Sequence, residues 1–306
     1  MSLLVTGSIG IDTVEAPWGK VTNALGGSSV YFSYAASFFS PVRLVGVVGG
    51  DCPKDFLRPL QDNPNIDVSG LEVRPSAKTF RWHGRYHQDV NLRDTVKVEL
   101  NVLAEQRPEI PQAFRDSEFV FLANTHPALQ MELLNELAGP RLVVADTMDL
   151  WIANQRPKLT ELIGKIDALV LNDSEARQIS GQSNLVAAGS SIAEQVGRAR
   201  RSSFVVVKKG EHGSLLFADR RVLALPGYPV RRVVDPTGAG DCFAGAMMGF
   251  LAAGGEVSLP ALRRAIAYGT VTASVALEDF SLNRLLTTDR AELDARLAEF
   301  ESMLKF

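Results

Sequence analysis

The feature that most constrains the fold is a series of short segments that are apolar almost without interruption. They are Leu3–Thr6, Val42–Val48, Phe119–Leu122, Leu142–Ala145, Ala168–Leu171 and Phe204–Val207. Segments of this kind are typical of strands in a parallel sheet, whose two faces are both covered by helices. The stretches between them favour helices at Val30–Phe39, Lys54–Gln61, Pro127–Leu137, Pro157–Ile163 and Ala187–Ala199. This alternation predicts an α/β fold with a doubly wound, mainly parallel sheet flanked by helices.

Two stretches interrupt this alternation. Residues 12–23 contain Pro17 and Gly19, and residues 70–102 alternate polar and apolar side chains with a period of two. Such a period is typical of antiparallel strands that are solvated on one face. We therefore expect one α/β domain over residues 1–306, with a small antiparallel β subdomain inserted at about 12–23 and 70–102. Its role as a lid, a dimer surface or ordinary packing is left open by the sequence.

The composition excludes several classes of protein. The chain has 306 residues, of which 46% are hydrophobic, so it can bury a large core. A sequence pI of about 5.9 argues against a basic surface that binds nucleic acid. The two cysteines, Cys52 and Cys242, suit neither a disulfide framework nor a metal site, and we expect both thiols to be reduced. With no long apolar run and no leader pattern, we expect a cytoplasmic protein that does not bind a membrane.

The stretch Val234–Ala246 is the most informative for chemistry, because small residues there precede an apolar helix. Free backbone N–H groups at a helix N-terminus favour an anion, especially a phosphate. Asp241, in the same turn, would repel a phosphate, but it suits a general base that takes a proton from a hydroxyl attacking that phosphate. The alternative is an aspartate that only caps the helix.

The run Asp-Pro-Thr-Gly-Ala-Gly-Asp at 235–241 resembles the C-terminal signature of the ribokinase-like (PfkB-type) carbohydrate kinase family. Further matching motifs follow the family's order along essentially the whole chain: Gly7–Asp12, Gly26-Gly27, Gly46–Asp51, Asn172–Glu175 and Lys208–Gly213. The resemblance implies a ribokinase-like fold and a kinase that uses ATP and Mg²⁺. Its acceptor would be a hydroxyl of a sugar, polyol or nucleoside. A P-loop kinase is excluded, because the chain has no Walker A pattern.

The resemblance also assigns site residues. Asp241 would be the general base, and the anion hole would comprise Gly238, Ala239 and Gly240. The residues expected to border the nucleotide are Lys208, Gly210, Gly213 and Thr270. The alternatives are a solvated strand end for Lys208 and a core-facing helix position for Thr270.

Asn172 and Glu175 would, by the resemblance, help to hold Mg²⁺ through water. Their spacing of three places both side chains on one face at the start of a helix. The alternative for Glu175 is that it caps that helix.

The acceptor is the least defined part of the site. The resemblance gives Asp12, Gly26 and Gly27 to acceptor binding. The asparagine that usually follows the family's Gly-Gly is missing, and Tyr31 stands at about its place, either to stack on a ring or to fill space. Polar residues at strand ends line ligand crevices in α/β sheets, which adds Asn124 and Asp146.

Two other functions compete with a kinase. One is a non-catalytic sensor of sugars or nucleotides built on the kinase fold. The other is a dinucleotide-dependent oxidoreductase, which is disfavoured because no Gly-x-Gly-x-x-Gly follows the first strand. The expected partner is a small molecule. The inserted strands either pair two copies of the chain in a homodimer or cover the site.

Overall fold

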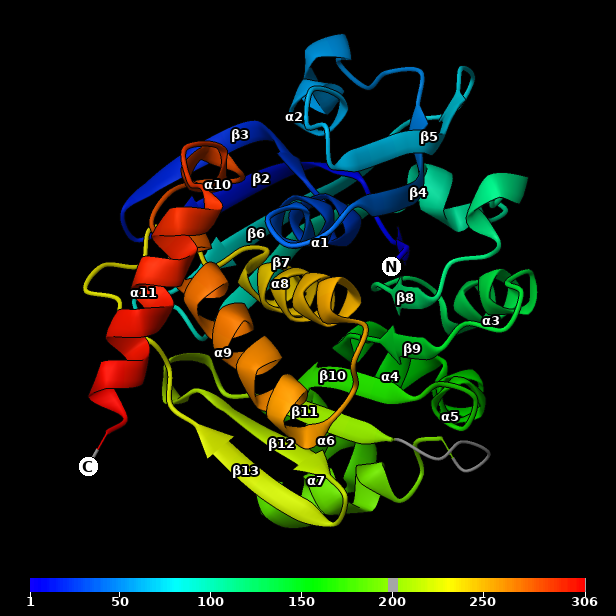
Figure 1. Ribbon diagram of the computed structural model, residues 1–306. Coiled ribbons are helices and arrows are strands. Elements are labelled where there is room, and N and C mark those ends of the chain that lie inside the picture. The colour runs from blue at the N-terminus through cyan, green and yellow to red at the C-terminus, as the bar shows by residue number, and fades with distance from the viewer. Residues whose placement is uncertain (198–202, 306) are drawn as a thin grey trace.

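The computed structural model, which describes residues 1–197 and 203–305, contains a nine-stranded sheet (Figure 1). Its strands, in spatial order, are β13 (Arg221–Leu225), β12 (Ser214–Ala218), β11 (Phe204–Lys208), β10 (Ala168–Asn172), β9 (Leu142–Ala145), β8 (Phe119–Leu122), β1 (Leu3–Thr6), β4 (Val42–Gly49) and β5 (Ile66–Arg74). The strands from β11 to β5 are parallel, and β12 and β13 add an antiparallel edge. The expected mainly parallel sheet is confirmed.

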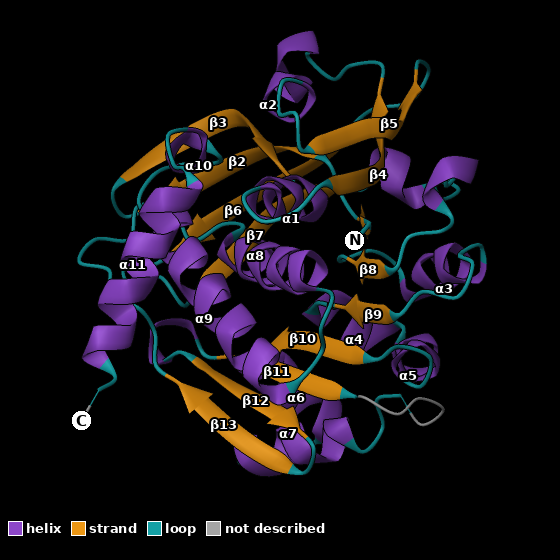
Figure 2. Ribbon diagram, in the orientation of Figure 1, coloured by secondary structure: helices purple, strands orange, loops and turns teal. Residues whose placement is uncertain are grey.

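Helices cover both faces of this sheet (Figure 2). Alternate residues of β1 enter two separate core layers, since Leu3 and Val5 belong to one and Leu4 to the other. The first layer includes residues of α1 (Ser28–Ser37), α8 (Ala239–Gly254), α9 (Leu259–Ala276) and α11 (Arg290–Met303). The second includes residues of α3 (Pro127–Asn135), α4 (Asp149–Asn154), α5 (Arg156–Ile163), α6 (Asp173–Ser180) and α7 (Leu185–Ala193). The near-continuous apolar strands are therefore buried on both sides.

Most of the expected helices are present. The expected helix at Lys54–Gln61 is a 3₁₀ turn, Lys54–Leu57, followed by the short α2 (Arg58–Gln61). Helix α7 ends at Ala193, and the expected end of that helix at Ala199 lies outside the described residues. A further short helix, α10 (Asn283–Leu286), follows α9. In the part of the chain that the structure describes, no helix is both long and apolar enough to cross a lipid bilayer.

A second, four-stranded sheet, which we call the lid, has the order β3-β2-β6-β7. Its strands are β2 (Gly10–Ala16), β3 (Gly19–Gly26), β6 (Phe80–Tyr86) and β7 (Arg93–Glu99). The β2–β3 and β6–β7 pairs are antiparallel, and β2 and β6 join them in parallel. The second inserted stretch begins later than expected, because residues 70–74 belong to β5 and pair with β4. As an edge strand with one exposed side, β5 shares the period of two that we used to predict the lid.

The base of the lid is fixed to the end of β4. Asp51 Oδ1 accepts a hydrogen bond from Thr79 N at 2.6 Å, and Asp51 Oδ2 accepts one from Arg81 Nη2 at 2.9 Å. Gly49 N in turn donates to Thr79 Oγ1 at 3.0 Å. These contacts hold the start of β6 at the carboxyl end of the large sheet.

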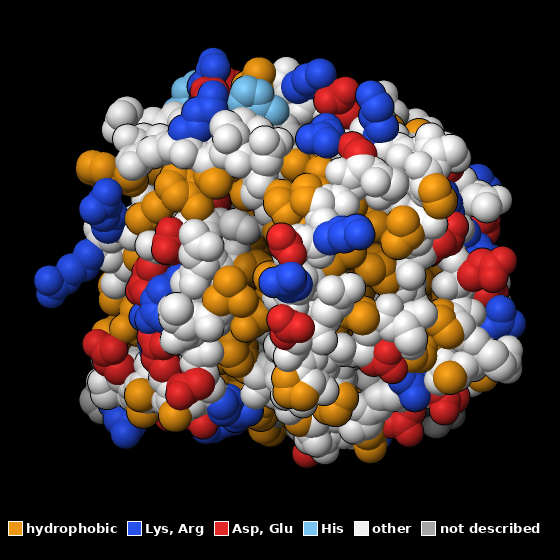
Figure 3. All heavy atoms as spheres, turned by 90° about the horizontal axis from the view of Figure 1, so that it is seen from above, with side chains coloured by type: hydrophobic (Ala, Val, Ile, Leu, Met, Phe, Trp, Pro, Cys, Tyr) orange, Lys and Arg blue, Asp and Glu red, His pale blue; other side chains and the backbone are white. Residues whose placement is uncertain are grey.

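The surface of the molecule is mixed in character. On the face shown in Figure 3, Lys and Arg side chains are interspersed with Asp, Glu and apolar groups. Both cysteines are free, with Cys52 half-buried and Cys242 buried, as expected.

Candidate active site

Side chains from neighbouring strand ends converge at the carboxyl edge of the large sheet. Asp146 follows β9, Glu175 lies in the first turn of α6 after β10, and Lys208 ends β11. Because β9, β10 and β11 are adjacent parallel strands, their carboxyl ends lie side by side. Asp241 comes from the first turn of α8. The Lys208 ammonium lies against this turn, since a Cβ built on Gly240 would be 2.6 Å from Lys208 Nζ.

The turn before α8 is held from two sides. Gly238, the N-cap residue, has φ +75°, and a Cβ on it would overlap the ring of the buried Tyr31. On the other side Asp235, which is 1% exposed, accepts hydrogen bonds from Thr237 N at 2.8 Å and Ser281 N at 3.3 Å. The turn therefore needs glycine at 238, and its backbone is fixed before any ligand arrives.

The three residues expected to form an anion hole differ in the hydrogen bonds of their N–H groups. Ala239 N already donates to Pro236 O at 3.3 Å. The N–H groups of Gly238 and Gly240 have no hydrogen-bond acceptor within the described residues. These two N–H groups are therefore free to bind a ligand, and the Lys208 ammonium lies against the same turn.

Asp241 has the protonation behaviour of a base. Burial raises its pKa to about 6, and the positive charges of Lys208 and, more weakly, Arg93 oppose that rise. A carboxyl group with this pKa is mostly ionised at pH 7, yet it binds a proton more readily than an exposed aspartate does. It is therefore suited to accept a proton from a hydroxyl group.

Asp146 and Glu175 are carboxyl groups that lack a full set of partners. Burial, and then the charge of Asp241, raises the pKa of Asp146 well above its usual range. Burial raises the pKa of Glu175 to about 7, against the effect of Lys208. Asp146 Oδ1 is buried without a hydrogen-bond partner. The Lys208 ammonium alone does not balance the charge that these carboxyl groups would carry when ionised. A further cation could therefore bind among them.

Asn172 and Glu175 form a capping box at the start of α6. Asn172 Oδ1 accepts from Glu175 N at 2.8 Å, and Glu175 Oε2 accepts from Asn172 N at 2.7 Å. The alternative role of Glu175 as a helix cap is thus present in the structure. No group of three or more His, Cys, Asp or Glu side chains among the described residues could hold a metal. Mg²⁺ needs fewer protein ligands than such a group supplies, because one or two carboxylates suffice and phosphates and water molecules complete its coordination shell.

Asp12 projects from the lid toward this cluster. It is 3% exposed, its carboxylate covers Gly26, and its Oδ1 atom has no hydrogen-bond partner. Burial, followed by the charges of Asp235 and Asp241, raises its pKa to about 8. Gly27, at φ +107°, opens α1 where a Cβ would overlap the Ser8 backbone. A buried, unpartnered carboxyl group of this kind suits hydroxyl groups of an acceptor.

The expected nucleotide loop follows β11. Gly210 and Gly213 both have positive φ, +55° and +80°, and a Cβ on Gly213 would overlap the Leu225 backbone. The lid reaches this loop, because a Cβ on Gly210 would be 2.6 Å from Asn91 Oδ1. Thr270 is different, since it is buried in α9 and its Oγ1 donates to Ile266 O at 2.9 Å. This geometry favours the core-facing alternative for Thr270.

Two residues that we expected to contact the acceptor, Asn124 and Tyr31, make contacts within the protein instead. Asn124 Oδ1 accepts from Trp151 Nε1 at 2.9 Å, and Asn124 Nδ2 lies 3.0 Å from Met148 Sδ. Tyr31 is 2% exposed and supports Gly238, so it fills space beneath the turn. Both arrangements favour a structural role.

The lid adds residues that the motifs did not indicate. Tyr86 OH forms a hydrogen bond of 3.2 Å with Thr237 Oγ1, next to Gly238. The period of two in β6 puts Trp82 and Tyr86 on one face, and that was the available signal. Sequence motifs gave no reason to assign either residue to the site.

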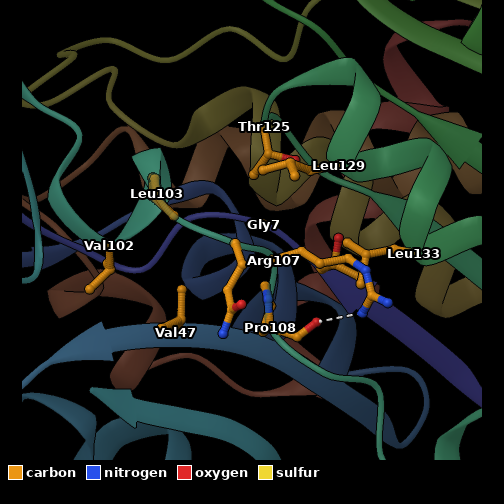
Figure 4. Close-up of a pocket in the computed structure, with 11 residues that line it drawn as sticks. Gly7, Val47, Val102, Leu103, Arg107, Pro108, Thr125, Leu129 and Leu133 are labelled. Carbon is orange, nitrogen blue, oxygen red and sulfur yellow. Dashed lines mark hydrogen bonds between the residues drawn. The ribbon is translucent and has the colours of Figure 1, made fainter. Parts of the chain in front are cut away.

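A small, largely apolar pocket lies elsewhere at the same edge, near the ends of β1 and β4 (Figure 4). It is lined by Thr6, Gly7, Val47, Val102, Leu103, Gln106, Arg107, Pro108, Thr125, Leu129 and Leu133. Its lining contains none of the carboxyl groups described above, so we place no chemistry there.

Comparison with known proteins gives consistent matches. The family model described as "pfkB family carbohydrate kinase" matches residues 19–289. A cytidine kinase of Thermococcus kodakarensis is 30% identical over 257 residues, which cover 82% of this chain and 88% of that protein.

Solved structures share the fold. The nucleoside kinase of Burkholderia thailandensis in complex with inosine has a TM-score of 0.79 at 18% identity, covering 97% of this chain and 98% of that one. The ribokinase of Cryptococcus neoformans in complex with ADP has a TM-score of 0.79 at 20% identity, covering 97% and 99%.

Proposed function

Because the chain belongs to the pfkB family of carbohydrate kinases, we propose that it transfers the γ-phosphoryl group of ATP to a hydroxyl of a nucleoside. The observation that carries the proposal is the position of Asp241. It lies in the first turn of α8, beside the unbonded N–H groups of Gly238 and Gly240 and the Lys208 ammonium. A base and an anion site in one turn are what in-line phosphoryl transfer requires.

In the proposed reaction, Asp241 removes the proton from the acceptor hydroxyl. The oxygen forms a bond to the γ-phosphorus as the bond from that phosphorus to the β,γ-bridging oxygen breaks, and ADP leaves with the electron pair. The N–H groups of Gly238 and Gly240, with Lys208, stabilise the charge on the moving group. Asp146, and Asn172 with Glu175 through water, would hold Mg²⁺, which neutralises charge on the phosphates when bound.

A nucleoside is favoured over a simple polyol by the lid and by a relative. Asp12 and Trp82 are partners in the β2–β6 ladder, so both project from the same face of the lid. An acceptor of hydroxyl hydrogen bonds beside an aromatic ring suits a ribose joined to a base. The relative that is 30% identical is named a cytidine kinase.

We also propose that the protein is cytoplasmic, and that two copies pair through their lids. The second proposal rests on β7, an edge strand whose Val96 and Val98 are 45% and 47% exposed. Sedimentation of the purified protein tests it, since a monomer at micromolar concentration would leave the lid with a covering role only.

The experiment that tests the function uses purified protein, Mg-ATP and a panel of nucleosides, sugars and inositols, scored for ADP release. We expect acceptor-dependent ADP release that is highest with a nucleoside. Samples without acceptor control for ATP hydrolysis. Turnover with sugars alone would contradict the nucleoside assignment, and binding of nucleosides and ATP without turnover would favour a sensor.

A further inference from the structure

The chain between α9 and α10, residues 277–281, contacts two separate parts of the proposed site. On one side it meets the turn before α8, because Leu277 O accepts a hydrogen bond from Val234 N at 2.7 Å. On the other side it meets strand β3 of the lid, because a Cβ built on Gly19 would be 3.2 Å from Phe280 Cε2. The segment therefore packs against both the turn and the lid.

Ser281 ends this segment and forms hydrogen bonds to both elements. Its hydroxyl Oγ donates to Leu25 O of β3 at 2.5 Å, and its backbone N–H donates to Asp235 Oδ2 at 3.3 Å. Asp235 Oδ1 accepts from Thr237 N, next to Gly238. One serine thus connects strand β3 of the lid to the carboxylate that fixes the turn before α8.

The end of β3 that Ser281 holds belongs to the acceptor side of the proposed site. Gly26 directly follows Leu25, and a Cβ on Gly26 would overlap the Asp12 carboxylate. In the β2–β3 ladder, Asp12 is paired with Ala24, the residue before Leu25. A displacement of Leu25 would therefore shift Asp12 relative to the large sheet.

Ser281 has a backbone conformation that serine rarely adopts. Its φ is +54°, in the left-handed region that favours glycine. Strained residues persist where the surrounding structure over-determines them, and they cluster at functional sites. The segment is also fixed on its far side, because Glu278 pairs with Arg284 and Arg296, each at 2.9 Å. Glycine would suit the backbone at 281 better, so the local fold by itself does not call for a serine hydroxyl there.

We propose that Ser281 is a positioning residue for phosphoryl transfer, which holds strand β3 in register with the turn before α8. This rests on the proposed kinase function. The acceptor hydroxyl must lie within reach of Asp241 and in line with the γ-phosphorus at the same time, and small errors in such an alignment lower the rate steeply. Asp12 lies on one side of the Ser281 bridge and Asp241 on the other. The two hydrogen bonds of Ser281 therefore fix the parts of the site that hold the two reactants relative to each other.

The first test is kinetic and uses Ser281→Ala, which removes the hydroxyl bond to Leu25. We expect kcat to fall about tenfold, since the acceptor hydroxyl is misplaced, while the dissociation constants of MgATP and acceptor change by less than about threefold. ADP release without phosphorylation of the acceptor should rise relative to kcat, because water then competes better for the phosphoryl group. A kcat within about twofold of wild type, or a loss that is confined to weaker binding, overturns the proposal.

Two further variants separate positioning from stability. Ser281→Gly also lacks the hydroxyl but relieves the strain at φ +54°, so we expect it to unfold no earlier than Ser281→Ala and to have the same low kcat. The matched control is Ser117→Ala, just before β8 at the opposite edge of the large sheet, where a buried hydroxyl donates to Phe114 O at 2.6 Å. It should lower the unfolding midpoint with kcat unchanged. A wild-type kcat in Ser281→Gly contradicts the positioning role.

Amide hydrogen exchange of the ligand-free protein tests the bridge itself, without turnover. We expect Ser281→Ala to speed exchange by about threefold or more both in residues 19–26 of β3 and in residues 234–238 of the turn, and Ser117→Ala to change neither. Faster exchange on only one side of Ser281 means that the serine does not join the two parts. If both sides respond but wild-type protein phosphorylates no acceptor, the kinase function fails and the catalytic role of the bridge fails with it.

Discussion

Carboxyl groups have opposite surroundings at the carboxyl edge of the large sheet and in the lid. At the edge, Asp146 and Glu175 are buried around a single ammonium, and burial raises the pKa of both. On the outer face of the lid, Glu15 accepts hydrogen bonds from Lys20, Arg85 and His83, which lower its pKa to about 2. The carboxyl groups at the edge are therefore left for a bound cation to stabilise in their ionised form, whereas Glu15 of the lid is already stabilised by its basic neighbours.

The two regions also differ in backbone. The edge is built on strands whose residues are almost all buried, and glycines such as Gly238 fix the turn where a side chain would not fit. Strand β7 of the lid is exposed along nearly its whole length. We infer that the edge is preorganised and that the lid supplies the moving part. The following variants test that division, from the largest expected effect to the smallest.

Asp241→Asn should have the largest effect. The amide cannot accept the hydroxyl proton, and loss of a general base costs about 1,000-fold in kcat. The measurement is kcat with the best acceptor, beside the thermal unfolding midpoint and MgATP affinity, which should be nearly unchanged. Turnover within tenfold of wild type would sink the mechanism.

Gly238→Ala should disturb the edge through the backbone. Alanine at φ +75° is strained and its Cβ overlaps Tyr31, so the turn must shift. We expect about a 100-fold loss of kcat, as for a displaced oxyanion donor. The matched control is Gly139→Ala, at φ +71° with open space around it, which should lose about 1 kcal/mol of stability and no activity. Equal effects of the two variants would mean that Tyr31 does not position the turn.

Asp12→Asn should separate stability from binding. Because burial raises the pKa of Asp12 to about 8, the folded protein binds its proton more tightly than the unfolded chain does. The stability this contributes is present at low pH and is lost as pH rises from about 4 to about 8. Asparagine needs no proton, so the variant should gain unfolding free energy relative to wild type as pH rises. Urea unfolding of both proteins at pH 5 and pH 8 measures this.

The same variant should bind acceptor more weakly above about pH 8, where the wild-type carboxyl group is ionised and the amide replaces a charged acceptor of hydroxyl hydrogen bonds. An unfolding difference that is the same at both pH values would show that Asp12 is ionised in the folded protein. Asp12 would then resemble Glu15 of the lid, whose ionised form is stabilised by its neighbours.

Asp51→Asn should have the smallest effect and act on the lid alone. It weakens the hydrogen bonds to Thr79 N and Arg81, each of which is worth about 1 to 2 kcal/mol. We expect faster amide hydrogen exchange in residues 80–99, an acceptor KM raised about threefold and unchanged exchange in β1 and β10. The control is Asp116→Asn, an exposed carboxylate paired with Arg43. Faster exchange throughout the large sheet would break the comparison.

The large sheet and the lid also differ in how well the sequence predicted them. Apolar strands buried on two faces carry a strong signal, and those six were located correctly. The hairpin of β12 and β13 was missed, because Asp219 and Arg220 adopt positive φ without the Asn-Gly or Asp-Gly pattern of such turns. Strand β13 is also largely exposed, which removes its apolar pattern.

For the site, the motifs singled out the turn at Asp241 and the strand ends as candidates, whereas the contact of Tyr86 with Thr237 was not predicted. That contact depends on how the lid packs against the turn before α8, and no local pattern reveals such packing. The engagement of Asn124 with Trp151 likewise depends on a contact between separate elements. Roles that depend on such pairings are not contained in a local run of residues.

The parallel pairing of β2 with β6 has a mechanical consequence. One half of the lid leaves the large sheet after β1, the other leaves it after β5, and the ladder joins the two across its middle. Because hydrogen bonds between β2 and β6 join the two strand pairs, one pair cannot separate from the large sheet without the other. Any displacement of the lid relative to the large sheet would therefore carry Asp12 and Trp82, partners in that ladder, together.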